Sequence, residues 1–192
     1  PSAIREHSWS PSGNKILLDI QQNQTSLFYI LDINTGVLTQ INTDATIMSD
    51  MRWSAQTDWL IASCFINKQW QICRIANTTA DIELITSSGG ISPYSPVNSD
   101  YVYFTRQQQG LWRIPLLGGT ATMVWKDFPE HAWKNAVLYQ QELYYLTNDH
   151  DAQSTLVKRD LISNQETVLY QGKFKWDETS IDISPSGKFL YM

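Results

Sequence analysis

The sequence repeats a short line of residues along its length. This line reads SWSPSGNKILL over residues 8–18 and DISPSGKFLY over residues 182–191. Two weaker copies, MRWSA and PYSPV, begin at Met51 and Pro93. Counted at the residue before the shared Ser, the copies are separated by 44, 41 and 89 residues, and the last interval is about two repeats long. The chain is therefore built from repeats of roughly 40–45 residues.

Each repeat divides into four short segments rich in β-branched and aromatic residues, which favour strands. In the first repeat these segments are residues 7–10, 15–20, 26–32 and 37–41, with Gly- and Asn-containing turns between them. Repeats of this length with four strands each are typical of β-propeller blades. The sequence predicts an all-β fold, a β-propeller segment of four four-stranded blades plus the start of a fifth.

The same spacing gives the boundaries of the blades. One domain, residues 1–192, contains blades at about 7–44, 50–88, 91–127 and 133–172, and the next blade begins within 180–192. The second strand of each blade is apolar on both faces, as expected where neighbouring blades cover it. Residues 43–51 are predicted to form a short helical turn. The chain begins without Met and stops inside a repeat, so we expect it to be a segment of a longer protein.

The composition excludes several classes of protein. Hydrophobic residues make up 42% of the chain and charged residues 17%, which is typical of a globular domain rather than a disordered one. The net charge of -5 and the absence of any basic run argue against direct contact with nucleic acid. No stretch approaches the ~20 continuous apolar residues of a membrane span.

The only two cysteines lie close together in the second repeat. If Lys68 and Gln69 form the tip of a hairpin, Cys64 and Cys73 lie directly opposite each other on neighbouring strands, near disulfide distance. Two buried free thiols are the alternative. The sequence leaves both interpretations open and favours the free thiols.

No familiar catalytic motif occurs in the chain. It has no G-x-S-x-G nucleophile elbow, H-E-x-x-H zinc motif, P-loop or dinucleotide fingerprint. Ser10 and Ser184 each precede a Pro and are interpreted as turn residues rather than nucleophiles. The sequence predicts a protein that is not an enzyme and has no cofactor or metal.

Two clusters could carry chemistry, and each has a simpler interpretation. Asp149, His150 and Asp151 could bind a divalent cation, but adjacent residues of one loop rarely converge without ligands from elsewhere, so a solvated loop is favoured. Glu130 and His131 could act as an acid–base pair, although a surface or packing histidine is favoured.

The loops between second and third strands share one face of a propeller with the loops that join successive blades. These loops are 21–25, 43–50, 67–69, 87–91, 106–109, 127–133, 148–154 and 172–179. They are rich in Gln, Asn and Asp, which suits recognition of a polar ligand or a protein. The candidate binding residues are Arg106, Gln107, Gln108, Trp125, Glu130, His131, Asp149, His150, Asp151 and Trp176.

The tryptophans divide into two groups by position. Trp125 and Trp176 lie at loop edges and are predicted to make exposed contacts. Trp9, Trp53 and Trp133 lie at or near the first strand of a blade, closest to the propeller axis. They could line the mouth of a ligand site, but packing between blades is favoured, because large aromatic side chains dominate protein cores.

The repeated line resembles the blade repeat of TolB-like propellers. In that family an aromatic-Ser-Pro-Asp-Gly-Lys turn precedes an apolar strand. The segments WSPSGNKI from Trp9 and ISPSGKF from Ile183 match this pattern, with Ser in place of Asp, and LDINTG from Leu31 matches the family's second turn. The copies around Ser54 and Ser95 depart from it, and the fourth repeat lacks Ser-Pro. The resemblance implies a TolB-like, WD40-like β-propeller.

A narrower resemblance suggests a function. Residues 110–119 and 180–185 are similar to the C-terminal part of bacterial winged-helix regulators of the CadC/ToxR type. This implies a periplasmic sensory domain of an inner-membrane transcriptional regulator, whose DNA-binding domain and membrane helix lie outside this sequence. Its partner would be a protein or a small polar ligand, and this segment would contact no nucleic acid.

Two alternatives and one further expectation accompany this interpretation. The chain could be the propeller of a prolyl-oligopeptidase-like serine peptidase, or a periplasmic TolB-like scaffold. The open blade edges of a propeller segment also predict self-association.

Overall fold

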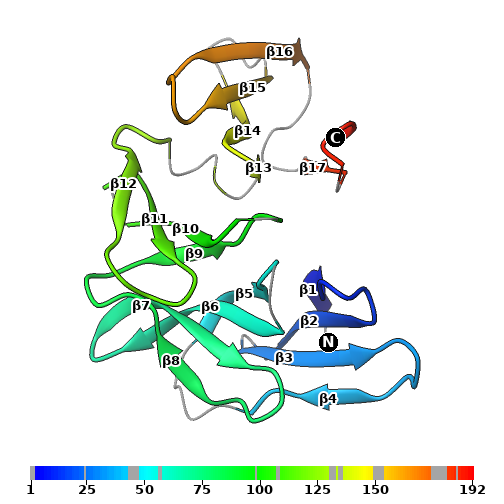
Figure 1. Ribbon diagram of the computed structural model, residues 1–192. Coiled ribbons are helices and arrows are strands. Elements are labelled where there is room, and N and C mark those ends of the chain that lie inside the picture. The colour runs from blue at the N-terminus through cyan, green and yellow to red at the C-terminus, as the bar shows by residue number, and fades with distance from the viewer. Residues whose placement is uncertain are drawn as a thin grey trace.

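The computed structural model describes residues 3–23, 25–42, 48–55, 58–97, 99–106, 109–129, 133, 136–148, 154–173, 181–184 and 186–192. Four antiparallel sheets of four strands follow one another along the chain and form an arc of blades (Figure 1). Within each sheet the strands pair in sequence order, so every blade is a simple meander. A fifth sheet of two strands follows blade 4. The predicted all-β propeller segment is confirmed.

The strands are as follows. Blade 1 comprises β1 (Ala3–Trp9), β2 (Lys15–Gln22), β3 (Thr25–Asp32) and β4 (Leu38–Gln40). Blade 2 comprises β5 (Met48–Trp53), β6 (Trp59–Ile66), β7 (Gln69–Ala76) and β8 (Ile82–Leu84). Blade 3 comprises β9 (Ile91–Tyr94), β10 (Tyr101–Thr105), β11 (Leu111–Pro115) and β12 (Thr122–Trp125). Blade 4 comprises β13 (Ala136–Tyr139), β14 (Glu142–Asn148), β15 (Ser154–Asp160) and β16 (Glu166–Gly172), and the fifth sheet β17 (Asp182–Ile183) and β18 (Leu190–Tyr191).

One local prediction is wrong. Residues 48–51, expected in a helical turn, belong to β5, and residues 43–47 lie outside the described part of the chain. Met48 pairs with Cys64 across the β5–β6 ladder, and a bulge follows, with Asp50 at a φ of 51°. Pairing with β6 and burial of Met51 in the core override the weak helical pattern.

The repeated Ser-Pro-Ser-Gly line forms the turn between the first two strands of a blade. The Ser10 hydroxyl accepts a hydrogen bond from the Lys15 N–H at 3.0 Å, and the Gly13 N–H donates to the Ser10 carbonyl. The Ser184 hydroxyl accepts from the Phe189 N–H at 3.0 Å, five residues on as in the first copy. Both serines therefore have the predicted turn-stabilising role.

The turn between the third and fourth strands also has the same conformation in blades 1, 2 and 4, although the residue types in it differ. Gly36, Ala80 and Asn164 each have a φ between 59° and 70° and each donates an N–H to the carbonyl four residues earlier. In blade 1 the Asp32 carboxylate accepts from the backbone N–H and the hydroxyl of Thr35, and chiefly the backbone bond lowers the pKa of Asp32. Ala80 therefore has a left-handed backbone conformation. For any L-residue that carries a Cβ, this conformation lowers the stability of the fold.

Replacing Ala80 with Gly is expected to stabilise the protein by roughly 0.5–1 kcal/mol, because glycine adopts this backbone conformation without steric cost. Urea unfolding followed by fluorescence would measure the gain. The matched control is Ala76→Gly, four residues earlier and in β7, which should destabilise. A loss of stability in Ala80→Gly would contradict the assigned turn.

Apolar clusters fill the three interfaces between successive blades. Leu60 belongs to the cluster that joins blades 1 and 2, and its neighbour Ile61 belongs to the cluster that joins blades 2 and 3. Successive residues of a strand point to opposite faces, so β6 is buried on both faces, as predicted. Tyr103 and Leu143 take part in the third cluster, between blades 3 and 4.

Trp9 is exposed, unlike Trp53 and Trp133, because it lies on the face of blade 1 that no described sheet covers. Trp53 and Trp133 are buried, as predicted for residues that pack between blades. Trp9 is 55% exposed, and Ile4 of the same strand is 62% exposed, so the prediction is wrong for Trp9. Among the described residues no sheet covers this side of β1 and β2. The predicted self-association through such surfaces stays a prediction.

A disulfide joins Cys64 and Cys73, whose Cα atoms are 6.1 Å apart. The hairpin tip is Asn67–Lys68, one residue earlier than expected, so Cys64 lies opposite Gln71 and Cys73 opposite Ala62. The two cysteines are diagonal neighbours on one face of the sheet, a separation within disulfide reach. The favoured free thiols are therefore wrong, and so is the predicted register.

No helix in the part of the chain that the structure describes is long and apolar enough to cross a bilayer.

Candidate functional site

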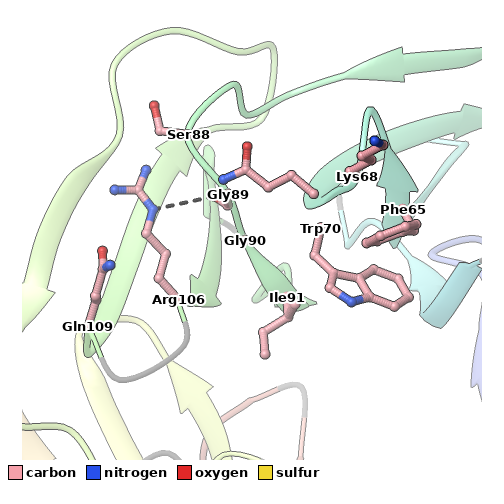
Figure 2. A pocket seen from close by; sticks show the side chains of 10 residues that line it. Phe65, Lys68, Trp70, Ser88, Gly89, Gly90, Ile91, Arg106 and Gln109 are labelled. Atoms are coloured by element: carbon pink, nitrogen blue, oxygen red, sulfur yellow. Dashed lines mark hydrogen bonds between the residues drawn. The ribbon is translucent and has the colours of Figure 1, made fainter.

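A pocket of about 390 Å³ opens between blades 2 and 3, on the face predicted for binding. Three loops meet there: the β6–β7 turn, the β8–β9 connection and the segment that follows β10. Its lining residues are Phe65, Lys68, Gln69, Trp70, Ser88, Gly89, Gly90, Ile91, Arg106 and Gln109. Figure 2 shows Arg106 and Gln109 on one side, Phe65, Lys68 and Trp70 across from them, and the two glycines between.

The β6–β7 hairpin supplies the aromatic wall. Phe65 and Trp70 are cross-strand partners, and their rings meet edge to face with centroids 5.4 Å apart. Asn67 and Lys68 at the tip have φ values of 52° and 65°, as a tight two-residue hairpin turn requires. The turn therefore places a lysine at the rim beside two aromatic rings.

Arg106, a predicted binding residue, forms the opposite wall. Its guanidinium lies over the Trp112 ring, 3.9 Å from the centroid, and its Nε donates to the Gly89 carbonyl at 3.3 Å. Partial burial lowers the pKa of Arg106, but an arginine remains charged at neutral pH. Within the described residues its two terminal nitrogens have no hydrogen-bonding partner. The Trp112 indole N–H donates to the Gln109 carbonyl at 2.8 Å and so holds the same loop.

A buried amide fixes the floor of the pocket. The Gln71 Oε1 atom accepts hydrogen bonds from the Thr86 hydroxyl at 2.8 Å and from the Gly89 N–H at 3.0 Å. The Thr86 oxygen in turn accepts from the Ile72 N–H at 2.8 Å. The Gly90 N–H donates to the Trp70 carbonyl at 3.0 Å. The β8–β9 connection is thus attached to β7 by satisfied, buried polar groups.

Close packing beneath the floor requires a residue without a side chain. A Cβ on Gly90 would lie 2.8 Å from Ile72 Cγ1 and 2.9 Å from Phe104 Cδ2, both in the core between blades 2 and 3. The backbone at Gly90 can therefore lie directly on this core.

Gln71→Leu is expected to lower the free energy of unfolding by about 2 kcal/mol, because the Gly89 N–H and the Thr86 hydroxyl lose a buried acceptor. Amide hydrogen exchange at Gly89 should accelerate in the same variant, and both effects are measured by urea unfolding and by exchange with NMR detection. Thr78→Ala is the control, since that side chain is exposed in the β7–β8 turn, away from the Gln71 amide, and should change stability by less than about 0.5 kcal/mol. Unchanged exchange at Gly89 in Gln71→Leu would contradict this role of the amide.

A second polar cluster clamps the inner strands beside the pocket. The Asp50 carboxylate accepts hydrogen bonds from the hydroxyls of Ser63 at 3.2 Å and Ser92 at 3.1 Å. Ser92 follows Ile91 of the pocket, and its N–H donates to the Ser63 hydroxyl at 2.8 Å. This cluster links blades 2 and 3 and fixes the start of β9.

The sequence-based candidates fare unevenly. Arg106 lines the pocket. Trp125 instead packs between blades 3 and 4, with its ring centroid 5.2 Å from that of Phe128 and 3.8 Å from the Arg159 guanidinium. Its predicted exposed position is corrected to partial burial, because blade 4 covers it. The candidates that lie outside the described residues are Gln107, Gln108, Glu130, His131, Asp149, His150, Asp151 and Trp176.

The pocket residues that sequence reasoning did not single out come from blades 2 and 3 and from the connection between them. Phe65 and Trp70 lie in strands whose successive side chains point to opposite faces of the sheet, so the sequence does not mark them. They become one wall of a pocket only because blade 3 packs beside them. The signal present in the sequence is the shared face of the loops at 67–69, 87–91 and 106–109. That convergence predicts the place but not the side chains that project into it.

The described lining of the pocket provides charged groups, carboxamides and aromatic rings. Among the described residues, two cations, two carboxamides and two aromatic rings line the pocket, and no carboxylate, histidine or cysteine joins them. Across the ranges that the structure describes, no three His, Cys, Asp or Glu side chains group as a metal site would require. Such a lining suits a polar or charged ligand with an apolar part.

The order of the blades invites comparison with known propellers. No known family model matches the sequence. Among solved structures the chain is similar to TolB from Acinetobacter baumannii, with 14% sequence identity and a TM-score of 0.75 over 98% of this chain and 48% of that one. The fold is that of a TolB-like β-propeller.

Other solved structures are similar to the chain at lower TM-scores. A puromycin-hydrolyzing peptidase from Mycobacterium tuberculosis is 10% identical, with a TM-score of 0.63 over 88% of this chain and 29% of that one. A chain of the nidogen/laminin complex is 10% identical, with a TM-score of 0.59 over 96% of this chain and 67% of that one. At these identities the likeness concerns the fold alone. The TolB-like segment spans about half the length of the TolB chain it matches.

Proposed function

We propose that this chain is a non-enzymatic sensory or ligand-binding segment of a larger TolB-like propeller protein, and that the pocket between blades 2 and 3 is its recognition site. The observation that carries the proposal is the composition of that pocket. It combines Arg106, Lys68, carboxamides and an aromatic wall, and the part of the lining that the structure describes contains no acid–base pair that could activate Ser88.

The proposed parent is a membrane-anchored transcriptional regulator whose propeller lies in the periplasm. The Cys64–Cys73 bridge supports an oxidising compartment, because structural disulfides persist there and are rare in the cytosol of most organisms. The fold likeness to a puromycin-hydrolyzing peptidase supports a second candidate, the propeller of a serine peptidase, with equal fold-level weight.

Transcript profiling with the full-length parent tests this proposal. Strains that carry Arg106→Ala or Trp70→Ala are expected to alter the same set of transcripts at least fivefold relative to wild type, because both variants damage one recognition site. Arg113→Ala is the matched control, since this arginine also stacks on an aromatic ring of blade 3 but does not line the pocket. Unchanged transcripts at equal protein level would overturn the regulatory proposal, and a loss of peptidase activity in the parent would favour the second candidate.

A further inference from the structure

The pocket has a local charge opposite to that of the chain. The protein carries a net charge of -5, yet the charged side chains of the described lining are those of Lys68 and Arg106, with no described Asp or Glu beside them. A concave surface lined by one sign of charge concentrates ligands of the opposite sign. The lining therefore favours an anion over a cation or a neutral polar molecule.

The geometry of Arg106 specifies the kind of anion. Its ring contact with Trp112 covers one face of the guanidinium, and the bond from Nε to the Gly89 carbonyl fixes its orientation. The two terminal nitrogens form the planar fork that matches the two oxygens of a carboxylate. Lys68 lies on the exposed hairpin tip across the pocket, so the preorganised fork of Arg106, with neutral carboxamides on Gln69 and Gln109, suits a carboxylate better than a multiply charged group.

The opposite wall specifies what the anionic group is attached to. Phe65 and Trp70 offer an edge-to-face aromatic pair across the pocket from Arg106 (Figure 2). Planar rings pack well against such a pair. The volume of about 390 Å³ accommodates one ring with a short arm.

We infer that this pocket selects a carboxylate carried on or next to a planar apolar ring, with the carboxylate on Arg106 and the ring against Trp70 and Phe65. The inference rests on the proposed recognition function of the same site. The chemistry has two sources, a free aromatic acid or the C-terminal aromatic residue of a peptide.

Calorimetric titration of the 192-residue chain with matched pairs of probes tests the inference. Indole-3-acetate is compared with indole-3-acetamide, and acetyl-Gly-Gly-Phe with its C-terminal amide. We expect at least one acid to bind 10-fold or more tightly than its amide, since a charge-assisted hydrogen-bonded pair contributes roughly 1.5–3 kcal/mol. The pair that shows the preference identifies the source.

Variants locate the preference. Arg106→Ala and Arg106→Gln should abolish the advantage of the acid, Arg106→Lys should keep part of it, and Arg113→Ala should keep it in full. The wild-type comparison of acid with amide needs no variant, so a misfolded variant leaves the test intact. Equal affinity for acids and amides, or no binding of any probe at millimolar concentration, would overturn the inference. The proposed regulatory function fails separately, through unchanged transcripts in the parent.

Discussion

Phe104→Ala is expected to lower the free energy of unfolding by about 4 kcal/mol. Phe104 is fully buried in the cluster between blades 2 and 3, so truncation removes a large apolar side chain and leaves a cavity that its neighbours fill only in part. Its ring also lies beneath the pocket, with its centroid 5.6 Å from the Arg106 guanidinium. The variant should therefore weaken ligand binding as well as stability.

Urea unfolding followed by tryptophan fluorescence would measure the loss from Phe104→Ala. Leu117→Ala is the control, because Leu117 is 80% exposed and its truncation should change stability by less than about 0.5 kcal/mol. A loss below about 1 kcal/mol for Phe104→Ala would mean that blades 2 and 3 do not depend on this ring for their packing.

Gly110→Ala is expected to cost about 3 kcal/mol or more, because two penalties combine. Gly110 has a φ of 80°, a conformation that costs an L-residue with a Cβ roughly 1–2 kcal/mol. A Cβ there would also overlap the backbone carbonyl oxygens of Trp125 and Lys126, which cannot move without disturbing β12. Since the Arg106 N–H donates to the Gly110 carbonyl at 3.4 Å, the same change would displace the guanidinium from the pocket.

Gly118→Ala separates these penalties. Its φ of 89° is similar, but a Cβ at Gly118 would meet no atom within 4 Å. We expect Gly118→Ala to cost only about 1–2 kcal/mol, the backbone strain alone. Thermal or urea unfolding of both variants checks the difference. Equal losses would show that the carbonyls of Trp125 and Lys126 move aside with no cost in folding free energy.

The blades could be predicted because the turns between their strands are formed by residues close together in the sequence. Ser10 and Gly13 form the first turn through bonds to residues at most five positions away, so the sequence line and the turn coincide. The β6–β7 register was missed because its turn has no glycine. Asn67 and Lys68 both adopt positive φ, which residue type alone does not indicate for a lysine. The hairpin tip therefore lies one residue earlier than predicted, and the two cysteines are diagonal neighbours rather than directly opposed.

The binding site was predictable in place but less so in detail. Arg106 follows a strand whose end could be located, and the loop face follows from the meander. Exposure near a blade interface depends on the next blade, which explains the error at Trp125, covered by Tyr145 and Arg159. The prediction for Trp9 has the opposite error: this side chain was expected to be buried, but it is exposed because no described sheet covers it. In each case the missing information was how one blade docks on another.

The Cys64–Cys73 bridge has a consequence for any measurement of binding. It joins the same two strands that carry Phe65, Trp70 and the Lys68 turn, and Cys64 lies directly opposite Gln71, the amide that holds the pocket floor. In a reducing buffer those strands would be held by backbone pairing and side-chain packing alone. The measured affinity would then depend on whether the sample had been exposed to a reducing agent. Oxidation of the two cysteines would thus determine ligand binding as much as the residues that contact the ligand.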